Sequence, residues 1–153
     1  MSVVCWNYQG LENPCTVKAL QKVVLEEDPI LVFLIETKLV VSEMEGIKSK
    51  LDQQQGLVVP SVRRGGGLAL LWRNSTKVDV QTFSPHHIDV IVTDDHDNRK
   101  WRFTGFYGHS ETSKREVSWQ LLEELERRYT LLWICMGDFN EILHLGEKLR
   151  PEW

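Results

Sequence analysis

The sequence predicts an α/β fold of mixed, mostly antiparallel sheets flanked by helices. Over roughly the first third of the chain, short apolar runs alternate with segments whose apolar residues recur at helical spacing. Short strand-like runs separated by turn-forming residues follow. The length of 153 residues suits one domain and argues against a second full domain.

The chain is expected to begin with a strand and a helix. Residues 3–6 form a short apolar run, and Asn13-Pro14 supplies an N-cap residue followed by proline at the first helical position. The apolar spacing then predicts a helix to about Glu27, which Asp28-Pro29 would end. The apolar residues of this helix are Val17, Leu20 and Val24.

A second strand and a second helix follow. Residues 31–35 are all apolar, which is typical of a strand covered on both faces. Ser42-Glu43-Met44-Glu45 matches a capping box, the pattern of a helix start. The helix that it would open carries Met44, Ile47 and Leu51 on one face.

The middle of the chain has the pattern of an antiparallel sheet. Gly65-Gly66-Gly67 and the acidic segment 94–98 are expected as hairpin connections, because their residues tolerate turn geometry. The predicted strands are residues 57–62, 68–72, 78–83, 88–92 and 101–107.

The last predicted elements are a helix and a buried strand. Ser113-Lys114-Arg115-Glu116 matches a second capping box, and the helix would run to about Arg128. A final apolar strand, residues 131–136, leads into Gly137-Asp138-Phe139-Asn140. The apolar stripe of the helix is Val117, Leu121, Leu122 and Leu125.

Composition narrows the class of protein. The 18 Lys and Arg against 22 Asp and Glu give a net charge of −4, which argues against a protein that coats nucleic acid through many phosphate contacts. An enzyme acting on phosphodiesters remains compatible, because bound cations can supply positive charge. No run approaches the roughly 18 apolar residues of a membrane span. The N-terminus has no signal-peptide pattern and the three cysteines have no C-x-x-C spacing, so we expect a reducing, intracellular compartment.

Residues with carboxylate, amide or phenol side chains follow several of the predicted strands. Asn7, Glu36, Tyr107 and Asp138 each stand at or just after the end of an apolar run, and Asn140 follows closely. If the strands share a layered sheet, these side chains can gather at one edge. Carboxylates bind Mg²⁺ through oxygen, and amide or phenol groups can hold a phosphate. The set therefore predicts a site for metal-assisted phosphoryl transfer.

Weaker signals lie nearby. Arg63-Arg64, beside the three glycines, could contact a phosphate backbone, although a mobile hairpin is the favoured interpretation. The pair His86-His87 is interpreted as solvated turn residues rather than metal ligands. His109 is a candidate substrate contact because it follows Tyr107 so closely.

These residues also carry a family resemblance. The chain resembles the endonuclease/exonuclease/phosphatase superfamily, and most closely the endonuclease region of plant non-long-terminal-repeat (LINE-type) retrotransposons. The resemblance rests on five segments, in order Cys5-Trp6-Asn7-Tyr8-Gln9-Gly10-Leu11, Leu34-Ile35-Glu36-Thr37-Lys38, Gly65-Gly66-Gly67-Leu68-Ala69-Leu70-Leu71-Trp72, Phe103-Thr104-Gly105-Phe106-Tyr107-Gly108-His109 and Gly137-Asp138-Phe139-Asn140-Glu141-Ile142-Leu143.

The resemblance implies a four-layered α/β sandwich of the deoxyribonuclease-I-like kind that hydrolyses phosphodiesters with Mg²⁺ or Mn²⁺. By motif, Glu36 would be the main metal ligand and Asn7 would help to arrange the metal site. Tyr107 and Asn140 would contact phosphate, and Asp138 would orient the attacking water. In a retrotransposon such a domain nicks target DNA, so DNA is the implied partner and the nucleus the implied location.

The sequence also departs from the family pattern. Tyr8 and Gln9 stand where plant elements usually have cysteine and arginine, and Ser110 stands where proline is common. Family members continue to a late Ser-Asp-His-type motif, whose histidine stabilises the transition state, and the 153 residues contain no such motif. His109 or His144 would replace it only within hydrogen-bond reach of the scissile phosphate. We therefore expect a single, C-terminally incomplete domain over residues 1–153, a partial sandwich with impaired catalysis.

Two alternatives to a DNA-nicking domain stay open at this point. One is a non-enzymatic retrotransposon remnant with residual binding of metal or nucleic acid. The other is a phosphoinositide or nucleotide phosphodiesterase of the same superfamily. The target sequence and the oligomeric state are not indicated by any of these patterns.

Overall fold

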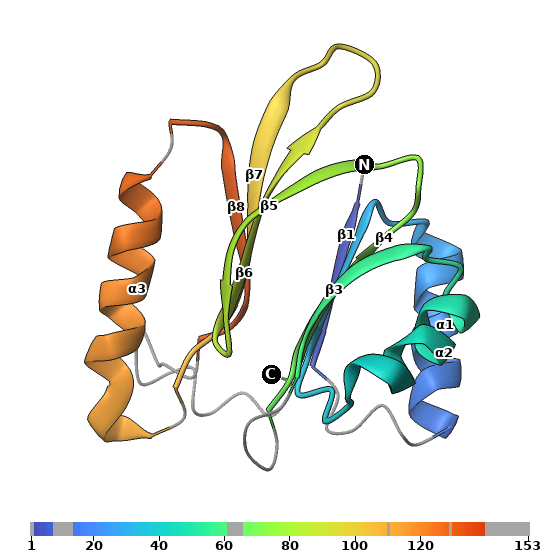
Figure 1. The fold of residues 1–153 in the computed structure, drawn as a ribbon, viewed down its shortest axis with the longest axis horizontal. Helices are drawn as coiled ribbons and strands as arrows, with labels where there is room; N and C mark the ends of the chain where they lie inside the picture. Colours follow the sequence, from blue (N-terminus) through green and yellow to red (C-terminus); the bar gives the residue numbers. More distant parts are fainter. Residues whose placement is uncertain (1, 8–13, 61–65, 110, 129, 140–153) are drawn as a thin grey trace.

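Two facing β-sheets form the centre of the molecule, and helices cover their outer faces (Figure 1). The computed structural model describes residues 2–7, 14–60, 66–109, 111–128 and 130–139, and within these ranges each sheet has four strands. The layer order is helix, sheet, sheet, helix. The α/β fold class that the sequence predicts, with mostly antiparallel sheets flanked by helices, is confirmed.

The first sheet contains the two N-terminal strands and the first two strands of the middle segment. Its strand order is β1-β2-β4-β3. β1 and β2 are parallel, because α1 carries the chain back across the outer face of the sheet between them. The other pairings are antiparallel. The elements are β1 (Val3–Asn7), α1 (Pro14–Glu27), β2 (Leu31–Ile35), α2 (Val41–Lys50), β3 (Gln55–Val59) and β4 (Leu68–Trp72).

The second sheet has the strand order β5-β6-β7-β8. Antiparallel hairpins join its first three strands, and α3 carries the chain across its outer face so that β8 lies parallel to β7. The turn predicted at residues 94–98 connects β6 to β7, and Asn98 adopts a φ of 57° there. The elements are β5 (Lys77–Ser84), β6 (His87–Thr93), β7 (Lys100–Tyr107), the 3₁₀ turn η1 (Thr112–Lys114), α3 (Arg115–Arg127) and β8 (Trp133–Asp138).

The prediction of one antiparallel sheet in the middle of the chain is wrong in its grouping. β3 and β4 pair with β2 in the first sheet, whereas β5, β6 and β7 belong to the second sheet. Alternating short strands do not specify a partner, and β4 is apolar enough to be buried at the centre of the first sheet, between β2 and β3. β3 also begins and ends earlier than predicted, and β8 extends to Asp138.

The core has two layers, and β2 contributes to both. Its side chains alternate, so that Val32 and Leu34 pack toward α1 and α2, while Leu31, Phe33 and Ile35 pack between the sheets. Each of these five side chains is at most 1% exposed. The prediction of a strand covered on both faces is therefore confirmed.

Both predicted capping boxes are wrong. α2 begins one residue before Ser42, with Val40 at the N-cap position, and α3 begins after the 3₁₀ turn that contains Ser113, with Lys114 at the N-cap position. Neither N-cap side chain makes a capping hydrogen bond. Packing of the apolar face outweighs a cap that contributes about 1 kcal/mol. Asn13, the cap predicted for the first helix, lies outside the described residues.

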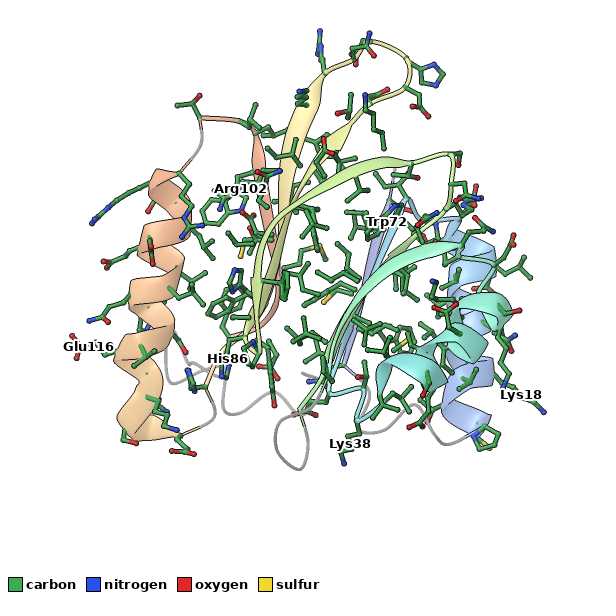
Figure 2. The ribbon with its side chains drawn as sticks, in the orientation of Figure 1. Lys18, Lys38, Trp72, His86, Arg102 and Glu116 are labelled. Atoms are coloured by element: carbon green, nitrogen blue, oxygen red, sulfur yellow. The ribbon has the colours of Figure 1, made fainter. Side chains whose placement is uncertain are left out.

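The apolar stripe of α3 is rotated from the predicted one. Val117 is 52% exposed, whereas Ser118 and Leu125 are buried against the second sheet. Figure 2 shows Arg102 of β7 on the side of the second sheet that faces α3. The buried Arg102 side chain pairs with the buried Asp89 of β6 and donates to the carbonyl oxygen of Leu125. A buried polar network, rather than apolar contact alone, thus joins α3 to the sheet.

No helix among the described residues is long and apolar enough to cross a membrane. Cys5 and Cys135 are half-buried and Cys15 is exposed, and none of the three is in a disulfide. Burial, with the nearby charge of Asp138 second, raises the pKa of the Cys5 thiol to about 11. Burial raises the pKa of Cys135 to about 12.

Candidate active site

The candidate site lies at the edge where two parallel strand pairs end. In the first sheet Asn7 of β1 is in register with Ile35 of β2, so Glu36 follows at the same edge. In the second sheet Tyr107 of β7 is in register with Asp138 of β8. Because parallel strands end at the same edge, each sheet delivers two polar side chains to one side of the molecule.

Two hydrogen bonds join these side chains across the sheets. The Asn7 Nδ2 atom donates to Asp138 Oδ2 at 3.1 Å, over 131 positions of sequence. The Tyr107 hydroxyl donates to Glu36 Oε1 at 2.5 Å, over 71 positions. The structure therefore brings together Asn7, Glu36, Tyr107 and Asp138. Three other predicted candidates, Asn140, Arg63 and Arg64, lie outside the described residues.

Glu36 stands in a turn with unusual backbone geometry. Its φ is 58° and that of Lys38 is 56°, in the left-handed region that residues other than glycine seldom adopt. The amide of Thr37 donates to the Gly67 carbonyl at 3.2 Å and that of Lys38 to the Gly66 carbonyl at 3.1 Å. Gly66 and Gly67 thus support the turn that carries Glu36, a structural role that the sequence analysis did not predict. An observed backbone outlier at a cluster of polar side chains is typical of a functional site.

The environment of Tyr107 keeps its phenol protonated. Burial raises the pKa of Tyr107 well above its usual value, and the hydrogen bond to Glu36 and the charges of Glu36 and Asp138 add to this rise. A protonated phenol is a hydrogen-bond donor at neutral pH. Tyr107 can therefore donate to a carboxylate, as it does here, or to a phosphate oxygen.

Close backbone contacts set the position of Tyr107 relative to Asp138. The Gly108 amide donates to the Asp138 carbonyl at 2.7 Å. A Cβ atom at Gly108 would overlap the carbonyl of Phe139, so glycine is needed for this approach. Gly137 adopts a φ of 149° against the carbonyl of Phe106 and has no room for a side chain either.

His86, His87 and His109 make contacts that the sequence did not indicate. His87 is buried in β6 and hydrogen-bonds Thr82 and Ser84 through its two ring nitrogens, so the interpretation of a solvated residue is wrong for it. The His86 and His109 rings lie 3.6 Å apart, centroid to centroid. His86 also contacts Tyr107, a contact that the sequence analysis missed because the two residues stand 21 positions apart. His109 is half-buried, and its ring reaches Tyr107 through His86.

The oxygen atoms at this edge suit a hard cation. Glu36 and Asp138 supply carboxylates, and Asn7 retains its Oδ1 atom because it donates to Asp138 through Nδ2. Mg²⁺ is commonly bound by one or two carboxylates, with water completing its coordination. In the described part of the chain no three His, Cys, Asp or Glu side chains form a metal-binding group. The donor set fits Mg²⁺ or Mn²⁺.

Comparison with known proteins gives one family match. Residues 4–152 match the profile described as the Endonuclease/Exonuclease/phosphatase family. The match covers nearly the whole chain, including each of the five sequence segments noted above. No curated protein sequence matches the chain.

Solved structures share the fold at low sequence identity. The human Nocturnin catalytic domain with a bound sulfate anion has a TM-score of 0.69 and 16% identity, over 92% of this chain and 64% of that chain. D. rerio TDP2 complexed with a single-strand DNA product has a TM-score of 0.66 and 15% identity, over 92% and 60%. The mannosyl-6-phosphatase Bt3783 of Bacteroides thetaiotaomicron has a TM-score of 0.68 and 14% identity, over 94% and 67%. This chain thus spans about two thirds or less of their length, and at these identities the likeness shows the fold alone.

Proposed function

Because this chain belongs to the endonuclease/exonuclease/phosphatase family, we propose that its strand-end site binds Mg²⁺ or Mn²⁺ and hydrolyses a phosphodiester of DNA. The observation that carries the proposal is the meeting of Asn7, Glu36, Tyr107 and Asp138, from four strand ends and both sheets. Proteins of the superfamily hydrolyse phosphodiesters or phosphate esters, which matches the oxygen-rich donor set.

Each of these side chains has a proposed role. Glu36 and the Asn7 Oδ1 atom hold the cation, which when bound would polarise a phosphoryl oxygen and offset charge on the leaving group. The protonated Tyr107 phenol transfers its hydrogen bond from Glu36 to a phosphate oxygen. Asp138, kept in place by Asn7, orients the attacking water and accepts its proton. Asn140, beyond the described residues, is proposed as a second phosphate contact.

The choice of DNA as substrate rests on the five-segment resemblance to plant retrotransposon endonucleases. On that basis we place the chain in a target-DNA-nicking domain that acts in the nucleus. The fold likeness to TDP2, which was crystallised with a single-strand DNA product, is compatible with this substrate. The net charge of −4 makes a bound cation important for approach to an anionic strand.

We propose slow turnover for the 153-residue polypeptide. Its sequence contains no Ser-Asp-His segment of the kind whose histidine stabilises the transition state in the family. Loss of one such stabilising group lowers kcat by roughly 10²–10³-fold. Metal binding and phosphate binding depend on Glu36, Asn7 and Tyr107 and are expected to persist.

The test is a plasmid-nicking assay with excess polypeptide and Mg²⁺, run alongside Mn²⁺ binding. The variants are Glu36→Gln and Asp138→Asn, and their matched controls are Glu123→Gln on the exposed face of α3 and Asp95→Asn in the exposed turn. We expect slow nicking that chelation abolishes. Glu36→Gln should lower both nicking and Mn²⁺ affinity, whereas Asp138→Asn should lower chiefly nicking, by about 10²-fold or more.

Several outcomes would contradict the proposal. Mn²⁺ affinity unchanged by Glu36→Gln would remove the metal-ligand role. Nicking that is equally fast in all four variants would point to a contaminating nuclease. Rapid nicking that both site variants abolish would contradict slow turnover while supporting the assigned roles. Cleavage of a phosphoinositide or a free nucleotide, with DNA left intact, would favour a different substrate of the same superfamily.

A further inference from the structure

His86 bonds both main-chain polar groups of Tyr107. The Tyr107 amide donates to the His86 carbonyl at 2.7 Å, which extends the β6–β7 pairing to the residue just before β6. The His86 Nδ1 atom lies 2.7 Å from the Tyr107 carbonyl oxygen. Figure 2 shows His86 at the lower end of the second sheet, the same end as Lys38 of the first sheet. His86 therefore stands at the edge that holds the candidate site.

The bond to the Tyr107 carbonyl determines which ring nitrogen of His86 carries a proton. A carbonyl oxygen only accepts hydrogen bonds, so Nδ1 must be the donor. The centroid of the His109 ring lies 3.6 Å from that of the His86 ring, and the Tyr107 ring is roughly parallel to the His86 ring, at 22°, with the centroids 6.1 Å apart. The imidazole thus has one orientation, set by a hydrogen bond and by ring contacts.

The segment after Tyr107 is held from its other side. The Gly108 amide donates to the Asp138 carbonyl, and the His109 amide donates to the Ser118 hydroxyl of α3 at 2.9 Å. Residues 107–109 are therefore bonded to the β5–β6 turn, to β8 and to α3. Among these contacts, those of His86 are the ones made to Tyr107 itself.

We propose that His86 is a positioning residue, which holds the main chain of Tyr107 so that the phenol reaches Glu36 of the opposite sheet. Its Nδ1–H group performs this role. The effect of His86 on catalysis rests on the proposed function, whereas its effect on the position of the Tyr107 phenol does not. Loss of the Nδ1–H donor would free the Tyr107 carbonyl and weaken the 2.5 Å bond between the phenol and Glu36.

Two substitutions of His86 distinguish the role of its Nδ1–H donor from that of the remainder of the imidazole ring. In His86→Asn the side-chain amide can place an N–H near the position of Nδ1, whereas His86→Ala provides no donor. His96→Ala, in the exposed β6–β7 turn, is the matched control. The first readout is the NMR signal of the Tyr107 ring in ¹³C-tyrosine-labelled protein, assigned with Tyr107→Phe. The second readout is kcat/KM for nicking, in the wild-type and Tyr107→Phe backgrounds.

We expect His86→Ala to shift the Tyr107 ring signal toward the value that Glu36→Gln produces, and His86→Asn to restore it. Where nicking is measurable, His86→Ala should lower kcat/KM by about 10-fold in the wild-type background and have almost no effect with Tyr107→Phe, because contacting residues are coupled. His96→Ala should change neither readout. Circular dichroism of each variant establishes that the fold is retained.

The proposal is overturned if His86→Ala leaves the Tyr107 signal in place, or if its effect on kcat/KM is undiminished with Tyr107→Phe. It is equally overturned if His86→Asn is as impaired as His86→Ala, because the ring would then act in another way. If the polypeptide nicks no DNA at all, the proposed function fails while the Tyr107 signal still decides the role of His86.

Discussion

Replacing Asp89 with alanine should strongly destabilise this protein. Asp89 is 0% exposed and accepts three hydrogen bonds, from Arg102 Nε at 2.7 Å, from Arg102 Nη2 at 3.1 Å and from Thr104 Oγ1 at 2.7 Å. Arg102 is 1% exposed, donates to the Leu125 carbonyl and lies 4.9 Å from the Trp133 ring. The substitution would leave this guanidinium buried without its counter-charge.

The size of the expected loss of stability depends on which contacts the Arg102 guanidinium retains in Asp89→Ala. Three bonds to an ionised group, at about 1.5–3 kcal/mol each, set an upper range of roughly 4.5–9 kcal/mol. Arg102 retains the Leu125 carbonyl and the Trp133 ring, so part of that energy remains. Breaking a buried ion pair at one partner typically costs about 3–5 kcal/mol, and we expect a loss in this range. Since a whole domain is stable by about 5–15 kcal/mol, Asp89→Ala should come close to unfolding the polypeptide.

The measurement is the free energy of unfolding in urea at pH 7, followed by far-ultraviolet circular dichroism and tryptophan fluorescence. Asp95→Ala, in the exposed β6–β7 turn, is the control and should change this free energy by less than about 0.5 kcal/mol. The double variant Asp89→Leu with Arg102→Met removes both charges. Its loss of unfolding free energy should be smaller than the sum of the losses measured for Asp89→Leu alone and Arg102→Met alone. A loss below about 1 kcal/mol for Asp89→Ala, or strict additivity in the double variant, would show that the buried ion pair is not what stabilises this part of the protein.

Three further predictions concern packing, pH and thiol reactivity. Gly105→Ala would place a Cβ atom against the Phe33 ring between the sheets, and should lower the free energy of unfolding in urea by about 1–3 kcal/mol. Adding Phe33→Leu to this variant should recover part of the lost stability. If it recovers none, a clash with the Phe33 ring is not the cause. Burial lowers the pKa of His87 below its ordinary 6.5, more than the nearby charge of Asp89 raises it, so His87 contributes stability above pH 6.5 that is lost as the pH falls through the lower folded-state pKa. His87→Gln should therefore flatten the unfolding free energy between pH 7 and 5, and an unchanged slope would contradict the assignment. Iodoacetamide at pH 8 should modify the exposed Cys15 first, as mass spectrometry can show, because burial protects the other two thiols and raises their pKa; equal rates at all three would exclude this.

Several elements of the fold were predictable from local pattern. β2 (Leu31–Ile35) and β4 (Leu68–Trp72) have the predicted boundaries, because an uninterrupted apolar run between turn residues has few alternatives in a layered domain. The position of Asn7, Glu36 and Asp138 after apolar runs was also visible in the sequence. Strand ends of this kind can be recognised without knowing how the strands pair.

Other features depended on partners distant in the sequence. The start of α1 at Pro14 was predicted correctly, whereas the starts of α2 and α3 were mispredicted because a cap contributes about 1 kcal/mol, which packing of the helix face exceeds. His86 was interpreted as a solvated turn residue because nothing near it in sequence indicates a bond to Tyr107. The burial of Arg102 and Asp89 was likewise hidden, since charged residues are almost never fully buried unless they are paired.

Local sequence pattern was enough to predict the α/β class, the order of strands and helices, the family resemblance and the polar residues that follow the strands. It did not show that β3 and β4 join β1 and β2, or that Asn7 meets Asp138 while Tyr107 meets Glu36, and these pairings emerged from the folded structure. The physical reason is that apolar periodicity specifies which face of an element is buried but not what covers it. The partner of each strand and side chain is selected by the packing of the two sheets as a whole.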